Sequence, residues 1–243
     1  MKASSKRSNN LQGVVTCPGD KSISQRSVII GSLLEEDIQI SGFLFAEDPL
    51  STIGALRNLG HEIEIDNDIV SVKNSRKKIS DQKVSCNLGN SGTGFRLISG
   101  LIAGQEIDAE LTGDDSLSKR PMNRIIKPLN EMGAKIGSNN GYAPLTFNKT
   151  QLAKEFQYEM PIASAQLKSC LLLAAISSNM KLTLNENKVS RDHTERMLKY
   201  FGANIATKKY HAKKESQVIH FLDTSRKVLI NYYIHHLYLQ EFL

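Results

Sequence analysis

The stretch Leu56-Arg57-Asn58-Leu59-Gly60-His61-Glu62-Ile63 joins the end of an amphipathic helix to the start of a strand through a glycine. Glycine is well placed directly after a helix because it adopts left-handed backbone angles without steric cost. The same order of residues returns twice, as Leu129-x-x-Met132-Gly133-x-x-Ile136 and as Leu198-x-x-Phe201-Gly202-x-x-Ile205. The three glycines are 73 and then 69 residues apart. This regular spacing predicts three copies of one supersecondary unit; the alternative is a chance match of three short motifs.

Each copy has the same expected order of elements around its glycine. An apolar helix, such as the one expected over residues 28–34, leads to an alternating strand, and a second helix then ends at the glycine. In the first copy, Asp66-Asn67-Asp68 forms the turn between two short strands, and one more strand precedes the unit. The sequence therefore predicts a mixed α/β (α+β) fold of three βαβαββ-type units, over about residues 14–75, 76–150 and 151–222.

The leading helix of each unit begins with a hydroxyl that is followed by a cation. Four or five residues separate the two members of each pair, which are Ser22 and Arg26, Ser91 and Arg96, and Ser164 and Lys168. The free backbone N–H groups and the positive end of the helix dipole favour anions at such positions. If the units are arranged alike around one core, the three helix N-termini face a common surface and reinforce one another there.

The first of these helix starts reads Pro18-Gly19-Asp20-Lys21-Ser22-Ile23-Ser24-Gln25-Arg26. Lys21 supplies a point charge, Ser22 a hydroxyl donor, and Arg26 a planar fork suited to carboxylate or phosphate. Ser22 and Arg26 are one helical turn apart and share a face. The segment predicts an anion-binding site; the alternative is a plain helix start with an exposed basic face.

Two further segments carry polar groups beside glycine or proline. Residues 88–96, Leu-Gly-Asn-Ser-Gly-Thr-Gly-Phe-Arg, hold three glycines before an apolar helix, which suits backbone donation to an oxyanion. In residues 114–122, Arg120 stands just before Pro121, a residue expected in a first helical turn. The alternative for this second segment is helix capping by Asp115 or Ser118, with Arg120 on the surface.

Composition places the chain among ordinary globular proteins. Its 243 residues are 40% hydrophobic and 23% charged, with a net charge of +6. No dense Lys/Arg run is interleaved with aromatics, and aromatics make up only 6% of the chain, so we expect an acidic small molecule and not nucleic acid. The three cysteines are odd in number and match no metal-ligand spacing, so we expect reduced thiols.

The chain has no apolar run long enough to span a membrane. Its longest run, residues 170–176, is far too short, and residues 1–10 are polar and basic with no apolar signal region after them. We therefore expect a cytoplasmic protein without a membrane partner.

These segments together resemble the 3-phosphoshikimate 1-carboxyvinyltransferase (EPSP synthase) family. The motifs that carry the resemblance are Pro18 to Ser22, Leu88 to Arg96, Arg120-Pro121 and Ser164-Ala165-Gln166, over a match from about Gly13 to about Phe221. Ser190-Arg191-Asp192-His193-Thr194-Glu195 and Ala165 are similar to the glyphosate-tolerant branch. Gly92 departs from that branch, which owes its tolerance partly to an alanine there, so this chain keeps room for the inhibitor.

The resemblance implies a reaction and a set of roles. The family transfers the carboxyvinyl group of phosphoenolpyruvate to the 5-hydroxyl of shikimate 3-phosphate, in chorismate and aromatic amino-acid biosynthesis, without a metal or cofactor. By resemblance Lys21 is catalytic and lies between both substrates, while Ser22 and Arg26 hold the shikimate carboxylate side. The remaining implied substrate-binding residues are Ser164 and Ser190 at the 3-phosphate, Gln166 with Ala165 at the shikimate ring, and Arg120 with Asn90, Gly92 and Thr93 at phosphoenolpyruvate. Lys168 is expected to face the same way as Arg26.

The chain is about half as long as members of this family. The resemblance implies a first segment at residues 1–13, one enolpyruvyl transferase lobe at 14–222 and an atypical tail at 223–243. Acid–base groups of the family's second lobe are missing, so we expect a half-site that needs a second lobe, possible as a separate partner chain, for turnover.

The tail has a different character from the rest of the chain. Residues 231–243 hold four of the fifteen aromatics, and family resemblance fails there. The leading hypothesis is a shifted reading frame or an early stop; the rival is a natural docking tail.

Other functions stay open beside the half-enzyme. One is a non-catalytic anion-binding module or inactive fragment. A closer one is the related UDP-N-acetylglucosamine enolpyruvyl transferase, which shares the repeat fold but differs in the loops at residues 20–22 and 190–195.

Overall fold

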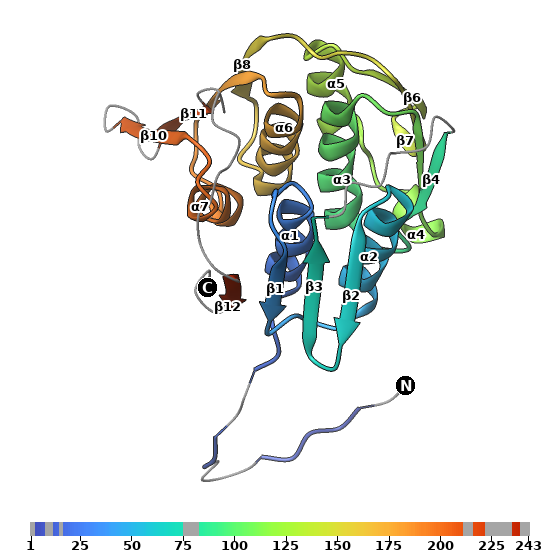
Figure 1. Cartoon of the computed structure of the whole chain (residues 1–243), viewed down its shortest axis with the longest axis vertical. Coiled ribbons are helices and arrows are strands. Elements are labelled where there is room, and N and C mark those ends of the chain that lie inside the picture. Colours follow the sequence, from blue (N-terminus) through green and yellow to red (C-terminus); the bar gives the residue numbers. More distant parts are fainter. Residues whose placement is uncertain are drawn as a thin grey trace.

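The computed structural model describes residues 3–7, 12–14, 17–74, 83–210, 216–221 and 235–238. Its described part is a mixed α/β fold. Three helices lie at the centre, with strands on three sides of them (Figure 1): α1 (Lys21–Gly31), α3 (Gly92–Gln105) and α6 (Ala165–Ser178). One hydrophobic core runs through these helices and the inner faces of the strands.

The strands form three four-stranded sheets with one shared pattern of pairing. The first sheet has the order β12 (His235–Tyr238), β1 (Ile38–Ser41), β3 (Ile69–Lys73), β2 (Glu62–Asp66). The second has the order β4 (Val84–Asn87), β5 (Ala109–Thr112), β7 (Tyr142–Asn148), β6 (Lys135–Asn139). The third has the order β8 (Glu155–Met160), β9 (Lys181–Glu186), β11 (Ser216–Phe221), β10 (Ile205–Tyr210). In every sheet the first two strands are parallel and the other pairs are antiparallel.

Four further helices are α2 (Glu47–Asn58), α4 (Asp115–Ser118), α5 (Asn123–Glu131) and α7 (His193–Tyr200). Helices α2, α5 and α7 each stop two residues before one of the repeated glycines. Gly60, Gly133 and Gly202 have φ of +91°, +108° and +84°, the region that favours glycine. The prediction that these glycines end the helices is confirmed, and each leads into the outer strand of its sheet.

Two central helices approach each other closely enough for backbone contact. Gly100 and Gly104 of α3 face α6, where a Cβ on Gly100 would lie 2.1 Å from the Cys170 carbonyl oxygen. A Cβ on Gly104 would lie 2.4 Å from the Ala174 carbonyl oxygen. Only glycine fits at these two positions, and this close packing sets the distance between the N-terminal turns of α3 and α6.

The tail contributes a strand where the sequence predicts only an atypical segment. Of residues 223–243, only 235–238 lie in the described part, and they form β12, which pairs in parallel with β1 from Ile38↔His235 to Ser41↔Tyr238. This is the position that β4 takes beside β5 and β8 takes beside β9. The rest of the predicted tail lies outside the described residues. In the predicted first segment, residues 3–7 and 12–13 have no helix or strand.

Several predicted boundaries shift in the structure. Helix α1 begins at Lys21, one residue before Ser22, and is capped by Asp20, while Asp114, and not Asp115 or Ser118, caps α4. Pro121 precedes α5, which begins at Asn123, so it is not in the first helical turn. No helix in the described ranges is long and apolar enough to cross a membrane.

Candidate substrate-binding site

The N-terminal turns of the three central helices are capped by side chains from the predicted motifs. Asp20 Oδ1 accepts from the Ile23 amide at 2.8 Å, and Ser91 Oγ accepts from the Gly94 amide at 3.1 Å. Ser164 Oγ accepts from the Leu167 amide at 3.3 Å. Each cap satisfies one helical N–H group and fixes where the following residues point.

Lys21 forms an ion pair that the sequence did not indicate. Its Nζ lies 2.7 Å from Asp48 Oδ2 in the first turn of α2, and 50% of the lysine side chain is exposed. An exposed pair of this kind is weak, so the ammonium stays available to an anionic ligand. Asp48 is the carboxylate that lies against the predicted catalytic lysine.

A buried glutamine connects the Lys21 helix to the glycine-rich loop. Gln25 Nε2 donates to Thr52 Oγ1 at 2.9 Å, to the Asp48 carbonyl at 3.2 Å and to Ser91 Oγ. A Cβ on Gly94 would lie 2.5 Å from Thr52 Oγ1, so this junction has no room for a side chain there. The loop of residues 88–96 is therefore held against both α1 and α2.

Hydrogen bonds hold Gln166 and Arg120 against the glycine-rich loop. Arg96 Nη1 donates to the Gly92 carbonyl at 2.9 Å and to Gln166 Oε1 at 3.1 Å. Gln166 Nε2 donates to Thr93 Oγ1 at 3.0 Å. Gln166 on α6 is thus oriented by two residues of α3, which lie 70 and 73 positions earlier in the chain.

Arg120 lies over the same loop. Its Nη2 donates to Asn90 Oδ1 and its Nη1 to the Asn90 carbonyl at 3.4 Å. A Cβ on Gly92 would lie 2.7 Å from Arg120 Nη1, so the glycine lets the guanidinium approach the loop. Burial lowers the pKa of Arg96, and the nearby charges of Arg124 and Arg120 lower it further. Three guanidinium groups thus gather at one end of α3.

The side chain of Arg26 is more buried than expected for a guanidinium that binds an anion at an open surface. Its side chain is 4% exposed, and it donates through Nε to Thr194 Oγ1 at 2.8 Å and through Nη2 to Ser169 Oγ at 3.0 Å. Nη1 donates back to the Ser22 carbonyl at 2.9 Å. Burial lowers the pKa of Arg26 to about 10, while Glu195 acts in the opposite direction. Arg26 therefore joins α1 to α6 and α7 and keeps part of its five-donor capacity for a ligand.

Two residues of the 190–195 segment lie near Arg26 and were not predicted as site residues. Arg191 is exposed and close enough to lower the pKa of Arg26. Burial lowers the pKa of His193, and Arg26 and Arg191 add to this effect. The imidazole of His193 is therefore neutral near pH 7.

The expectation for Lys168 is wrong. Its side chain is fully buried, and Nζ lies 3.1 Å from Glu186 Oε2 and 2.8 Å from Glu195 Oε1. The Lys168 ammonium is paired with two carboxylates inside the protein, so it does not face a ligand. Sequence spacing alone could not separate it from Arg26, because burial depends on α7 and β9 packing over α6.

Ser190, Ser164 and Ala165 lie at the same end of α6. Ser190 Oγ is buried and has no hydrogen-bond partner among the described residues. Ala165, in the first turn of α6, accepts through its carbonyl from Ser169 Oγ at 2.6 Å. Ser190 is linked to α6 through Lys168, whose Nζ lies 3.5 Å from the Ser190 carbonyl oxygen.

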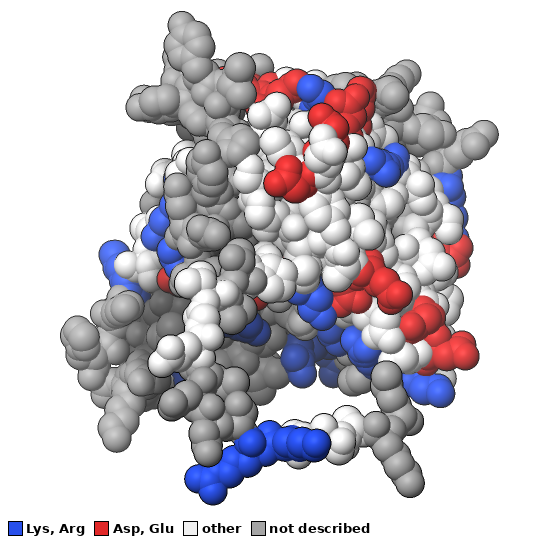
Figure 2. Space-filling model, turned by 90° about the horizontal axis from the view of Figure 1, so that it is seen from below, with Lys and Arg blue, Asp and Glu red and all other residues white. Residues whose placement is uncertain are grey.

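Charge is mixed over the described surface. On the face in Figure 2, basic and acidic side chains are both spread among uncharged ones, with basic groups more frequent along the lower edge. A continuous basic stripe of the kind that tracks a nucleic-acid backbone is not seen among the described residues of this face. The cationic groups of the candidate site are clustered at helix N-termini instead.

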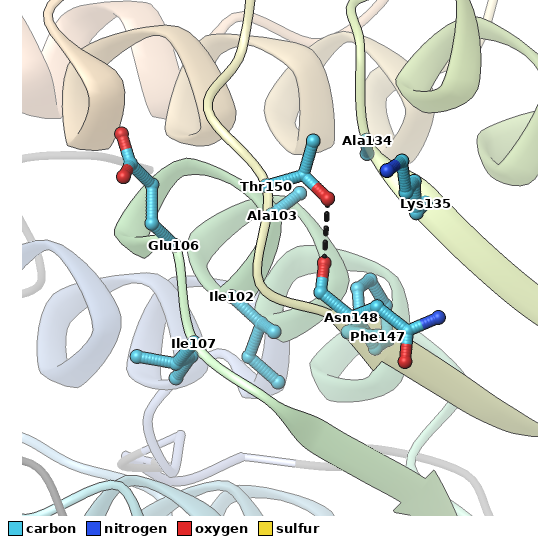
Figure 3. A pocket seen from close by; sticks show the side chains of 9 residues that line it. All are labelled: Ile102, Ala103, Glu106, Ile107, Ala134, Lys135, Phe147, Asn148 and Thr150. Atoms are coloured by element: carbon cyan, nitrogen blue, oxygen red, sulfur yellow. Dashed lines mark hydrogen bonds between the residues drawn. The ribbon is translucent and has the colours of Figure 1, made fainter. Parts of the chain in front are cut away.

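A small pocket lies away from the candidate site, at the C-terminal end of α3 (Figure 3). Its lining is mainly apolar, with Lys135 and Glu106 at its rim and a hydrogen bond from Thr150 Oγ1 to the Asn148 carbonyl. None of the predicted site residues lines it. Among the described residues, no group of three or more His, Cys, Asp or Glu side chains is placed to hold a metal.

The cysteines are unsuited to chemistry at the site. Cys86 and Cys170 are buried, and burial raises the pKa of Cys86 to about 11 and that of Cys170 as well. Their thiols are therefore protonated packing groups near pH 7. Cys17 is exposed.

Comparison with known proteins decides the family. The sequence model of EPSP synthase (3-phosphoshikimate 1-carboxyvinyltransferase) matches residues 5–219. The chain belongs to the EPSP synthase family. A 3-phosphoshikimate 1-carboxyvinyltransferase of Ruthia magnifica subsp. Calyptogena magnifica is 48% identical over 208 residues, which cover 84% of this chain and 47% of the relative. One of Thermoanaerobacter sp. (strain X514) is 46% identical over 201 residues, covering 82% and 47%.

A solved EPSP synthase structure supports the same assignment. That of Acinetobacter baumannii superposes with a TM-score of 0.74 and 40% sequence identity, over 85% of this chain and 46% of the other. The chain spans about half the length of the EPSP synthase relatives it matches. The predicted family and the predicted shortness of the chain are both confirmed.

Proposed function

We propose that this chain supplies the shikimate 3-phosphate side of an EPSP synthase active site and that turnover requires a second lobe. The reaction would transfer the carboxyvinyl group of phosphoenolpyruvate to the 5-hydroxyl of shikimate 3-phosphate. The observation that carries the proposal is that hydrogen bonds hold Lys21, Arg26, Gln166 and Arg120 at or near the N-terminal turns of the three central helices. Both substrates carry phosphate and carboxylate groups, which such a cluster of cations, hydroxyls and N–H groups favours.

The three sheets support an architecture for this half-site. Their common strand order fits three βαβαββ-type units, over about residues 14–75, 76–150 and 151–222, that together form one lobe of a two-lobed transferase. In units two and three the leading strand comes directly before its helix, whereas β12 from the tail takes that place in unit one.

The proposed roles are those that the resemblance to the EPSP synthase family implies. Arg120, with Asn90, Gly92 and Thr93, would bind phosphoenolpyruvate, and Gln166 with Ala165 would lie against the shikimate ring. Ser22 and Arg26 would hold the carboxylate side, and Ser164 and Ser190 the 3-phosphate. Lys21 would lie between the substrates as the catalytic cation, with Asp48 restraining it at 2.7 Å. Addition and elimination need groups that give and take protons, and Lys21 is the only one of these proposed residues suited to that role, so the remaining acid–base groups would come from the second lobe.

Two measurements test the proposal together. Isothermal titration calorimetry with the purified chain should detect binding of shikimate 3-phosphate. Mass spectrometry should detect the product only when the second half of an EPSP synthase relative, made separately, is added with both substrates. Product formed by the chain alone would refute the need for a second lobe. Binding without product in either mixture would favour an anion-binding module, and absence of binding would refute the proposed function.

A further inference from the structure

Three buried side chains form an ionic cluster beneath the segment that carries Ser190. Lys168 comes from α6, Glu186 is the last residue of β9, and Glu195 lies on α7. The exposed fractions of the three side chains are 0%, 0% and 5%. Burying three charged groups is costly unless they are paired and hydrogen-bonded, so their arrangement calls for an account beyond general stability.

Two members of the cluster hold the backbone of Ser190 on both sides. Glu186 uses one carboxylate oxygen, Oε2, to accept from Lys168 Nζ at 3.1 Å, and the other, Oε1, to accept from the Ser190 amide at 3.1 Å. Lys168 Nζ in turn points to the Ser190 carbonyl at 3.5 Å. The peptide groups before and after the Ser190 Cα are thus both anchored by buried charges.

The Ser190 side chain itself makes no such contact. Its Oγ is buried and without a partner in the described part of the chain. A buried hydroxyl is normally hydrogen-bonded, so a hydroxyl left open on an anchored backbone is suited to a ligand oxygen. The same segment continues into Thr194, which accepts from Arg26 at 2.8 Å, so the segment also contacts a residue proposed to bind the carboxylate side of shikimate 3-phosphate.

We propose that Glu186 and Lys168 are positioning residues, which hold Ser190 so that its hydroxyl is presented to the phosphate of shikimate 3-phosphate. This inference rests on the proposed function. Glu195 pairs with Lys168 at 2.8 Å through Oε1, and its Oε2 is buried without a partner among the described residues. Glu195 therefore belongs to the cluster without touching Ser190.

The difference between the two glutamates supplies a matched pair of variants. An amide side chain has only one acceptor oxygen. In Glu186→Gln this oxygen can accept from either Lys168 or the Ser190 amide, and the side-chain NH₂ group, which is a donor, then faces the other of these two donors. In Glu195→Gln the amide oxygen still accepts from Lys168, and the amide nitrogen replaces an atom that has no partner. A third variant, Glu186→Asp, keeps the charge beside Lys168 but is too short by one methylene to reach both partners, and guards against misfolding of Glu186→Gln.

The experiment measures binding of shikimate 3-phosphate and of shikimate, which lacks the phosphate, by calorimetry on the full chain and the three variants. Glu186→Gln and Glu186→Asp should bind shikimate 3-phosphate about tenfold more weakly, the loss expected for one hydrogen bond involving a charged group. Their affinity for shikimate should stay within about twofold, as should both affinities of Glu195→Gln. Exchange of the Ser190 amide hydrogen, followed by NMR without ligand, should be faster only in the Glu186 variants.

The possible outcomes separate this inference from the proposed function. Absence of wild-type binding to shikimate 3-phosphate refutes the proposed function and this inference with it. Wild-type binding together with equal losses in the Glu186 and Glu195 variants, or equal losses for both ligands, refutes the inference alone and leaves a purely structural cluster. Unchanged exchange at Ser190 in the Glu186 variants refutes it as well.

Discussion

Replacing Gly100 with alanine tests whether α3 and α6 are held together by backbone contact. The added Cβ would lie 2.1 Å, 2.8 Å and 3.1 Å from the Cys170 carbonyl oxygen, carbonyl carbon and Cα. All three atoms are backbone, so no side chain can rotate away, and the helices must move apart by about 1 Å. Alanine is better than glycine in a helix interior by about 1 kcal/mol, which offsets part of the overpacking cost of about 1–3 kcal/mol or more. We expect a net loss of about 2 kcal/mol, because the displaced surface belongs to the most extensive contact between two elements.

Gly54 of α2 supplies the matched control. It is exposed, within a helix, and a Cβ there would meet no atom within 4 Å. Gly54→Ala should therefore gain about 1 kcal/mol from helix propensity alone.

Thermal unfolding followed by circular dichroism measures both variants. For a chain of this size, about 2–4 °C of melting temperature corresponds to 1 kcal/mol, so Gly100→Ala should melt about 4–8 °C lower and Gly54→Ala about 2–4 °C higher than the parent chain. If Gly100→Ala melts at or above the parent temperature while Gly54→Ala behaves as expected, the close approach of α3 and α6 is refuted.

Three further predictions concern the first sheet and the site. A chain ending at Phe221 lacks β12 and exposes the edge of β1. Its free energy of unfolding, measured by urea denaturation, should be lower by about 2 kcal/mol, and its solutions should scatter more light on standing because the exposed strand edge promotes aggregation. Equal stability would contradict the β12 pairing. Arg26→Lys replaces a guanidinium that donates three hydrogen bonds by a single ammonium, and should lower the free energy of unfolding by about 2 kcal/mol. A loss below about 0.5 kcal/mol would show that the contacts to Thr194 and Ser169 are not made. Because burial and Arg26 lower the pKa of His193, its NMR titration midpoint should fall below 6.5. The stability that the neutral imidazole contributes is then present above pH 6.5 and lost as pH falls through the lowered pKa. A midpoint above 6.5 would contradict the burial of His193.

Local signals predicted much of this protein. The glycines at 60, 133 and 202 end their helices with positive φ, because a helix end needs a residue that tolerates this conformation wherever it lies in the fold. Ser91 and Ser164 cap α3 and α6 for the same reason, since a cap depends on atoms three residues away. Asp20 caps the first helix, which begins at Lys21, one residue before the serine that marked its predicted start.

Residues whose role depends on distant partners were harder to predict. Arg26 and Lys168 each follow a serine of their helix by four residues, yet Arg26 donates to hydroxyl and carbonyl oxygens whereas Lys168 is enclosed by two carboxylates. Asp48 carries no motif that links it to Lys21, and β12 lies in a segment without family resemblance. No window of sequence contains both partners of these contacts.

By itself the sequence determined the family, the recurring helix ends and the motifs that gather at helix N-termini, because capping, backbone conformation and periodicity act within a few residues. The tertiary structure alone decided which cations remain accessible and which are neutralised. Arg26 reaches Thr194 across 168 positions of the chain, and Lys168 meets Glu186 and Glu195 only after β9 and α7 pack over α6. Burial and long-range pairing set the energy of a charge, and neither exists until the chain has folded.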